Sequence, residues 1–169
     1  MRNNPDTIAQ AMTYADMMEA CASYLAVKKP RIKEPTAVCS LMSPIFQDAK
    51  QESIFAILLD TKSRVIGIPR ETTRGLIDST PTHPREIFRD AITESAAAVV
   101  LVHNHPSGDP TPSMEDINAT RRLVEAGRII GIPIFDHVII GKRFTDHDQP
   151  AYVSLRERNL VSFTASLNT

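Results

Sequence analysis

The chain has 169 residues, 42% of them apolar and 23% charged, with a formal net charge of −1. This size and composition fit one compact domain with a short appendage, and the charge gives no electrostatic reason to expect nucleic acid as the main partner. No apolar run is long enough to cross a bilayer, and no signal-peptide core opens the chain. Because Cys21 and Cys39 form no CxxC pair, we expect a reduced, cytoplasmic setting without membrane contact.

The first third of the chain is expected to be helical. Apolar spacing predicts a helix over residues 13–27, which Pro30 ends within a basic linker over residues 28–33. That linker is either a patch for nucleic acid or an acidic partner, or a solvated connector, and we favour the connector. A second helix is expected over residues 35–48.

The remaining elements alternate between strands and helices. Strands are expected over 52–59, 64–70 and 71–76, followed by a helix that Pro84 opens and that ends near Ser95. Next come a buried strand over 97–102, a helix over 112–130 with Thr111 as its cap and Gly131 as its stop, a strand over 132–140, a Gly141–Lys142 turn, a short strand over 151–153 and a short helix from Ser154. Mixed hairpins and strand–helix–strand units indicate an α/β (α+β) fold, with helices on both faces of a mixed sheet.

The most informative stretch is HNHPSGDPTPSMED, from His103 to Asp116. His103 and His105 are two residues apart, so in an extended backbone they point to the same face. The prolines and glycine that follow force a turn, and Asp116 falls in the first turn of the next helix. Three N/O ligands with an open fourth position are typical of a catalytic zinc site. An acidic first-turn residue is also favoured by the helix dipole alone, which suits Glu115 equally well.

This stretch resembles the JAMM (MPN-plus) metalloprotease signature, His-x-His, seven residues, Ser, two residues, Asp. The wording HNHPSGDPTPS resembles the RadC family, as do FAILLDTKSRVIG, RGLIDSTPTHPREIFRDAI, TRRLVEAGRIIGIPIFDHVIIG and YVSLRERNLV, in that order. The resemblance implies a JAB/MPN-type three-layer sandwich with the layout of cytidine deaminases, and it selects Asp116 as the third zinc ligand. We therefore divide the chain into an N-terminal helix and linker (1–34), a RadC-like metalloprotease domain (35–163) and a tail (164–169).

The resemblance also implies two catalytic roles. In JAMM proteins a glutamate on an upstream strand is the general base, and Glu52 at the start of ESIFAILLD matches it. A carboxylate beside zinc can take a proton from water and pass it to a leaving amine, although an exposed strand-end acid would look the same. Ser113 would donate a hydrogen bond to the developing oxyanion or cap the helix, and both roles can hold together.

Four other residues receive structural interpretations. Asn104 stands where many JAMM peptidases have Ser or Thr, and RadC-like sequences share it. Asp109 is expected to cap a turn, and His137 to be a satisfied core histidine rather than a ligand. Asp136 is offered as a hydrogen-bond partner of a ligand histidine.

The favoured function is a zinc-dependent metallopeptidase or isopeptidase acting on a protein or peptide. The alternatives are a non-catalytic metal-binding interaction module and a DNA-repair-associated protein. RadC proteins are usually described with a DNA-binding-like helical region, but no helix-hairpin-helix glycine pattern precedes residue 35, which weakens the repair interpretation. A zinc deaminase is disfavoured because that class needs H-x-E and P-C-x-x-C, whereas this chain has His105 and no CxxC. The oligomeric state is left open.

Overall fold

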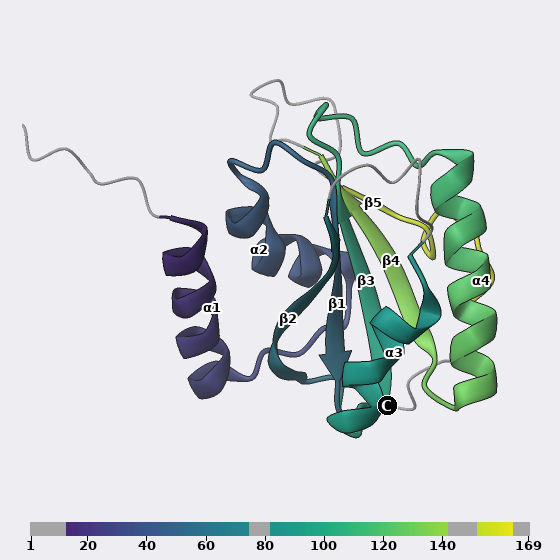
Figure 1. Cartoon of the computed structure of the whole chain (residues 1–169), viewed down its shortest axis with the longest axis horizontal. Helices are drawn as coiled ribbons and strands as arrows, with labels where there is room; N and C mark the ends of the chain where they lie inside the picture. The colour runs from purple at the N-terminus through teal and green to yellow at the C-terminus, as the bar shows by residue number, and fades with distance from the viewer. Residues whose placement is uncertain (1–12, 75–81, 142–151, 164–169) are drawn as a thin grey trace, which may run out of the picture.

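The computed structural model describes residues 13–74, 82–141 and 152–163, which are arranged in three layers (Figure 1). The middle layer is a five-stranded sheet in the order β2-β1-β3-β4-β5. Its strands are β1 (Ser53–Leu59), β2 (Val65–Arg74), β3 (Ala98–Asn104), β4 (Ile134–Ile140) and β5 (Tyr152–Ser154). One face carries α1 (Tyr14–Lys28) and α2 (Pro35–Phe46), and the other carries α3 (Pro84–Thr93) and α4 (Met114–Ile130). The predicted three-layer sandwich is confirmed.

The strand directions bring segments that are far apart in the sequence to one end of the sheet. β3 is central, antiparallel to β1 and parallel to β4. Ile54 near the start of β1 therefore pairs with His103 near the end of β3, and Asn104 pairs with Ile140 at the end of β4. This end of the sheet therefore brings together the residues just before β1 and those at the ends of β3 and β4.

The core lies on both faces of the sheet, and the two central strands are buried along their whole length. On the α2 face Phe55 packs with Met42, whereas on the α3 face Leu58 packs with Phe88. A strand covered on both sides has no solvent-facing positions, so it appears as a continuous apolar run rather than as an alternating one. This is why the strands over 52–59 and 97–102 were predictable.

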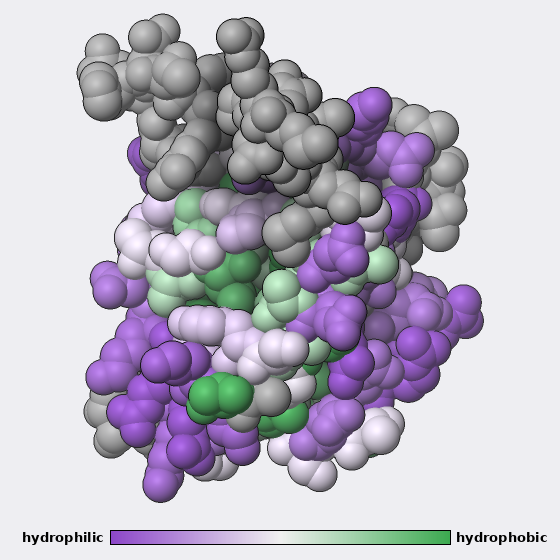
Figure 2. Space-filling model, turned by 90° about the vertical axis from the view of Figure 1, so that its left-hand side faces the viewer, coloured by the Kyte–Doolittle hydropathy of each residue, from purple (hydrophilic) through white to green (hydrophobic). Residues whose placement is uncertain are grey.

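A shallow apolar groove follows the outer helical layer. It has a volume of about 750 Å³ between α1 and α2, and Figure 2 shows apolar residues gathered among polar ones on this side of the molecule. Its lining includes Met17, Cys21, Tyr24, Leu41 and Ile45. The groove lies on the side of the sheet opposite to α3 and α4.

The basic linker is more ordered than a solvated connector. Ile32 is only 2% exposed, and its N–H donates to the Ser63 carbonyl while Val65 N–H donates to the Pro30 carbonyl. The backbone of Arg31 forms an isolated antiparallel β-bridge with that of Arg64. The linker therefore packs against the β1–β2 turn through Ile32, while its basic side chains are exposed, as expected of a solvated connector.

Three boundaries also differ from the prediction. The expected third strand over 71–76 does not start anew, because β2 continues to Arg74; as an edge strand it tolerates Pro69, and register shifts opposite β1 absorb the irregularity. The cap of α4 is Ser113 rather than Thr111. After β5 the chain forms turns instead of a helix, since Asn159 adopts a left-handed φ of 54°.

None of the helices within the described ranges is both long and apolar enough to span a membrane. Several expectations fall on other parts of the chain. The N-terminal residues 1–12, Lys142 of the predicted turn and the tail over 164–169 lie outside the described residues.

Candidate metal centre

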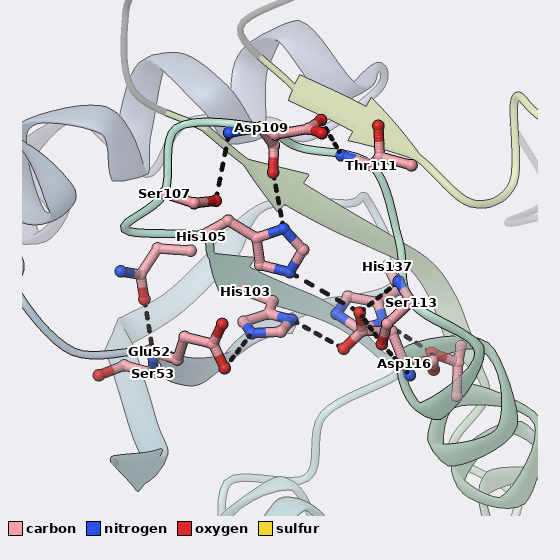
Figure 3. A network of polar contacts seen from close by, with 12 residues as sticks. Glu52, Ser53, His103, His105, Ser107, Asp109, Thr111, Ser113, Asp116 and His137 are labelled. Atoms are coloured by element: carbon pink, nitrogen blue, oxygen red, sulfur yellow. Dashed lines mark hydrogen bonds and ion pairs between the residues drawn. The ribbon is translucent and has the colours of Figure 1, made fainter. Parts of the chain in front are cut away.

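Four predicted site residues come together at the end of the sheet where β1 starts and β3 ends (Figure 3). Glu52 precedes β1, His103 and His105 lie at the end of β3, and Asp116 lies in the first turn of α4. Ligand atoms of Glu52, His103 and His105 all lie within 4.8 Å of one another. Asp116 faces both imidazoles, with Oδ1 3.2 Å from His103 Nδ1 and Oδ2 3.7 Å from His105 Nε2. The structure therefore gathers two nitrogen donors and two carboxylates.

His103 is the most deeply buried member, with a side chain that is 1% exposed. Its Nε2 lies 3.9 Å from Glu52 Oε2, yet neither ring nitrogen has a hydrogen-bond partner within the described part of the chain. Burial alone would lower the pKa of His103, but the carboxylates of Asp116 and Glu52 hold the pKa above its usual value. Leaving buried polar atoms without hydrogen bonds costs about 1–3 kcal/mol each, and a metal ion would engage one of these nitrogens.

His105 is oriented by the turn that follows it. Its Nδ1 lies 2.7 Å from the main-chain oxygen of Asp109, and because a carbonyl can only accept, Nδ1 carries the proton. In the neutral ring the lone pair is then on Nε2, the nitrogen that faces Asp116. The Asp109 carboxylate accepts from Thr111 N–H at 2.9 Å, as expected of a turn cap. This arrangement presents a metal-ready nitrogen to the site.

The loop that follows β3, residues 105–110 (the metal loop), packs tightly against the end of β4. His105 N–H donates to the Ile140 carbonyl at 2.9 Å. A Cβ placed on Gly141 would lie 2.1 Å from the Gly108 carbonyl oxygen, and Gly108 has a φ of 97°, a conformation suited to glycine. Gly141 is therefore required by a close backbone approach, and Gly108 by its positive φ.

Asp116 is held in place by Ser113 through a capping box. Asp116 Oδ2 accepts from Ser113 N–H at 2.8 Å and from the Ser113 hydroxyl at 2.7 Å, while Asp116 N–H donates to Ser113 Oγ. Burial would raise the pKa of Asp116, but contacts with His103, His105 and Ser113 hold the pKa well below its usual range. Asp116 is 5% exposed whereas Glu115 is exposed, so Asp116 is the first-turn acid at the site.

The cap has a consequence for the second predicted role of Ser113. The hydroxyl proton is already donated to Asp116. The capping role is thus present in the structure, and the oxyanion role stays a prediction that would need this proton to be redirected.

Glu52 differs from Asp116 in its accessibility. Its side chain is 42% exposed, so the description as a strand-end acid holds alongside its place at the site. The contact with His103 lowers the pKa of Glu52, and partial burial opposes that shift. Glu52 is therefore ionised, accessible and adjacent to an imidazole.

His137 is buried, as expected of a core histidine, and its ring stacks at 6.0 Å from that of His103. Thr120 Oγ1 donates to the Asp116 main-chain carbonyl at 2.6 Å, so its 2.7 Å contact with His137 Nδ1 places a proton on that nitrogen. His137 Nε2 has no hydrogen-bond partner among the described residues, so the expectation of a satisfied histidine is wrong at this nitrogen. Sequence reasoning missed Thr120, although a position four residues after Asp116 lies on the same helix face.

The expected role of Asp136 is wrong. Its carboxylate accepts hydrogen bonds from His137 N–H, the Ser154 hydroxyl and Arg156 N–H, not from a ligand histidine. Asp136 lines a pocket with Val38 on the α2 side, whereas the site lies toward α4. Alternation along β4 places neighbouring side chains on opposite faces, so Asp136 stabilises the turn after β5 instead.

We expect Thr120→Val to lower the free energy of unfolding of the metal-free protein by about 1–3 kcal/mol, because His137 Nδ1–H would lose its buried partner. Thr93→Val is the matched control, since Thr93 makes the same hydrogen bond to the carbonyl four residues earlier on an exposed surface. The control should change stability by no more than about 0.5 kcal/mol. Urea unfolding of both variants measures the difference, and equal losses would contradict the Thr120–His137 hydrogen bond.

A cavity of about 830 Å³ borders the site. Asp116, Thr120 and His137 form one wall, and Ile54 and Leu101 contribute apolar surface. Of the four converging residues, Asp116 is the one that lines this cavity.

Comparison with known proteins places these residues in a family. Residues 32–160 match a family model described as RadC-like JAB domain. Similar proteins named UPF0758 protein occur in Moorella thermoacetica (49% identical over 131 residues, 77% of this chain and 53% of that protein), Clostridium beijerinckii (39% over 154 residues, 90% and 64%) and Methanosarcina mazei (38% over 153 residues, 90% and 63%). The chain spans between about half and two thirds of the length of these relatives.

Proposed function

Because the chain belongs to the RadC-like JAB domain family, we propose that it is a zinc-dependent metallopeptidase or isopeptidase that hydrolyses an amide bond in a protein or peptide. Two imidazoles and two carboxylates converge here, and the buried His103 ring has no hydrogen-bond partner among the described residues; both observations support this proposal. An N/O donor set with two histidines suits zinc. When bound, the metal would acidify a water molecule and polarise the substrate carbonyl.

We assign His103, His105 and Asp116 as the residues that hold the metal. Asp116 suits a ligand because it is buried, ionised and fixed by Ser113. Glu52 suits a base because its half-exposed side chain reaches both the site and solvent. Buried, restrained groups keep a fixed geometry, whereas a proton carrier has to contact water and the leaving group.

In this proposal the chain's own residues move one proton and orient the reactants. Glu52 accepts the proton of the attacking water and later donates it to the leaving amine nitrogen. The Asp109 carbonyl and Ser113 keep His105 and Asp116 in place. Ser113 would stabilise the oxyanion only after its hydroxyl turns away from Asp116.

The second candidate function is a non-catalytic metal-binding interaction module. The engagement of the Ser113 hydroxyl with Asp116 favours it, because the proposed oxyanion donor is occupied in this arrangement. Both candidates require metal binding, so they differ in hydrolysis alone. A DNA-repair association would require salt-sensitive nucleic-acid binding, and we expect none in a gel-shift assay at low salt.

Metal analysis combined with a substrate screen tests the proposal. Purified protein should contain about one zinc per chain, as a single three-ligand site requires, and should cleave a member of a peptide and isopeptide panel. Chelation should abolish the cleavage, and zinc should restore it. Absence of metal binding would overturn both candidates, whereas metal binding without hydrolysis would favour the interaction module.

The free cysteines Cys21 and Cys39 agree with the cytoplasmic setting that we propose.

A further inference from the structure

Asn104 lies between the two histidines and is 3% exposed. Its side chain makes two hydrogen bonds to the main chain of the neighbouring segment. Asn104 Oδ1 accepts from Ser53 N–H at 2.7 Å, and Asn104 Nδ2 donates to the Gln51 carbonyl at 3.0 Å. The two bonds therefore fall on either side of Glu52.

This segment lies at the limit of the sheet. The last backbone pair between β1 and β3 at this end joins Ile54 to His103, so the Asn104 amide continues the pairing where main-chain groups no longer do. An amide is suited to this task because it offers a donor and an acceptor in one plane. An ionised carboxylate lacks the donor, and a hydroxyl has to make both bonds through a single oxygen atom.

The carboxylate of Glu52 depends on this support. Its nearest charged partner at the site is His103 Nε2 at 3.9 Å, which is longer than a hydrogen bond. With 42% of the side chain exposed, packing alone does not fix its direction. The backbone on both sides of Glu52 must then set where the carboxylate can reach.

We propose that Asn104 is a positioning residue, which clamps residues 51 and 53 and thereby directs the Glu52 carboxylate at His103. The inference rests on the proposed function for the role of Glu52. The clamp itself concerns only the protein, so it can be tested without any substrate. It also gives the residue between the two metal-binding histidines a physical role.

The test compares Asn104→Ala with Asp60→Ala. Asp60 is a matched control because its side chain likewise makes two hydrogen bonds to the backbone, with Oδ1 accepting from Lys62 N–H and Arg64 N–H, at the opposite end of β1. Both variants are compared with wild type by amide hydrogen exchange, by crystal structure and by hydrolysis at saturating zinc. Asn104→Asp, which retains the acceptor for Ser53 N–H but not the donor, serves if the alanine variant does not fold.

We expect exchange of the Ser53 amide to be about tenfold faster in Asn104→Ala than in Asp60→Ala, the factor for one lost hydrogen bond. The Glu52 carboxylate should leave His103 in the crystal structure of Asn104→Ala, and hydrolysis should fall with zinc still bound. Equal Ser53 exchange in the two variants, or an unmoved Glu52, would overturn the proposal. If wild-type protein hydrolyses nothing, the proposed function fails while exchange and structure still decide the clamp.

Discussion

Glu52→Gln is expected to lower hydrolysis by about 10²- to 10⁴-fold, the usual contribution of a general base, while zinc remains bound. Glutamine has nearly the same shape but cannot accept the proton of the attacking water. His105 and Asp116 keep the hydrogen bonds that orient them in the variant, since none of these bonds involves Glu52, and His103 keeps its contact with Asp116. Zinc content and single-turnover cleavage of the best substrate measure the two effects separately.

Glu94→Gln is the matched control for this substitution. The Glu94 side chain is also 42% exposed and faces one basic group, Arg70, at 3.4 Å, but it lies away from the four converging residues. It should leave both zinc content and cleavage unchanged. Full cleavage by Glu52→Gln would disprove the assigned base, and loss of zinc from it would show that Glu52 is a metal ligand, as its grouping with His103 and His105 also allows.

Lowering the pH from 6.5 to 5 should destabilise the metal-free protein by about 2 kcal/mol through His137 alone. Burial, and then the charge of His103, lowers the pKa of His137 to about 3. A histidine in an unfolded chain has a pKa near 6.5. Between pH 6.5 and 5, His137 therefore binds a proton in the unfolded chain but stays neutral in the folded one. The stability contribution is therefore complete above pH 6.5 and is lost as the pH falls toward 3.

His103 acts with the opposite sign at higher pH. Its folded-state pKa is raised, so its contribution is complete below pH 6.5 and is lost as the pH rises through the folded value. Together the two histidines predict that the metal-free protein is most stable near pH 6.5.

The control for this pH prediction is His137→Gln, whose amide can still donate to Thr120 but does not titrate. Urea unfolding in a chelating buffer should show the acid-side slope in wild type and in His83→Gln, which changes an exposed histidine. In His137→Gln the loss of unfolding free energy between pH 6.5 and 5 should be smaller by about 2 kcal/mol. Subtracting the two curves also removes Asp136, whose pKa is raised by burial and which acts in the opposite direction. An unchanged slope in His137→Gln would contradict the prediction.

Much of the fold was predictable from local patterns. The central strands are long apolar runs, and capping residues or prolines mark the starts of α1, α2, α3 and α4. The errors arose where tertiary context decides. Pro69 interrupts the pattern of a strand that nevertheless continues at the sheet edge, and Ile32 packs against a turn far along the chain. The division of the chain into residues 1–34, 35–163 and 164–169 stays a prediction.

The site was predictable to the extent that its spacing is local. His103, His105 and a first-turn acid lie within one strand–turn–helix unit, so their convergence follows from that unit's geometry, whereas the choice of Asp116 over Glu115 came from the resemblance to JAMM and RadC proteins. The roles of Asn104 and Thr120 depend on partners 51 to 53 and 17 residues away, which no local pattern reveals.

The contact between the Gly108 and Gly141 backbones limits how this fold can be engineered. A loop graft that replaces residues 105–110 also has to supply a β4 terminus that fits it, because no side chain can occupy the space between them. Libraries that randomise only one of the two segments should yield mostly members that fold poorly at this position. Exchanging both segments together is the design that preserves the packing of the two backbones.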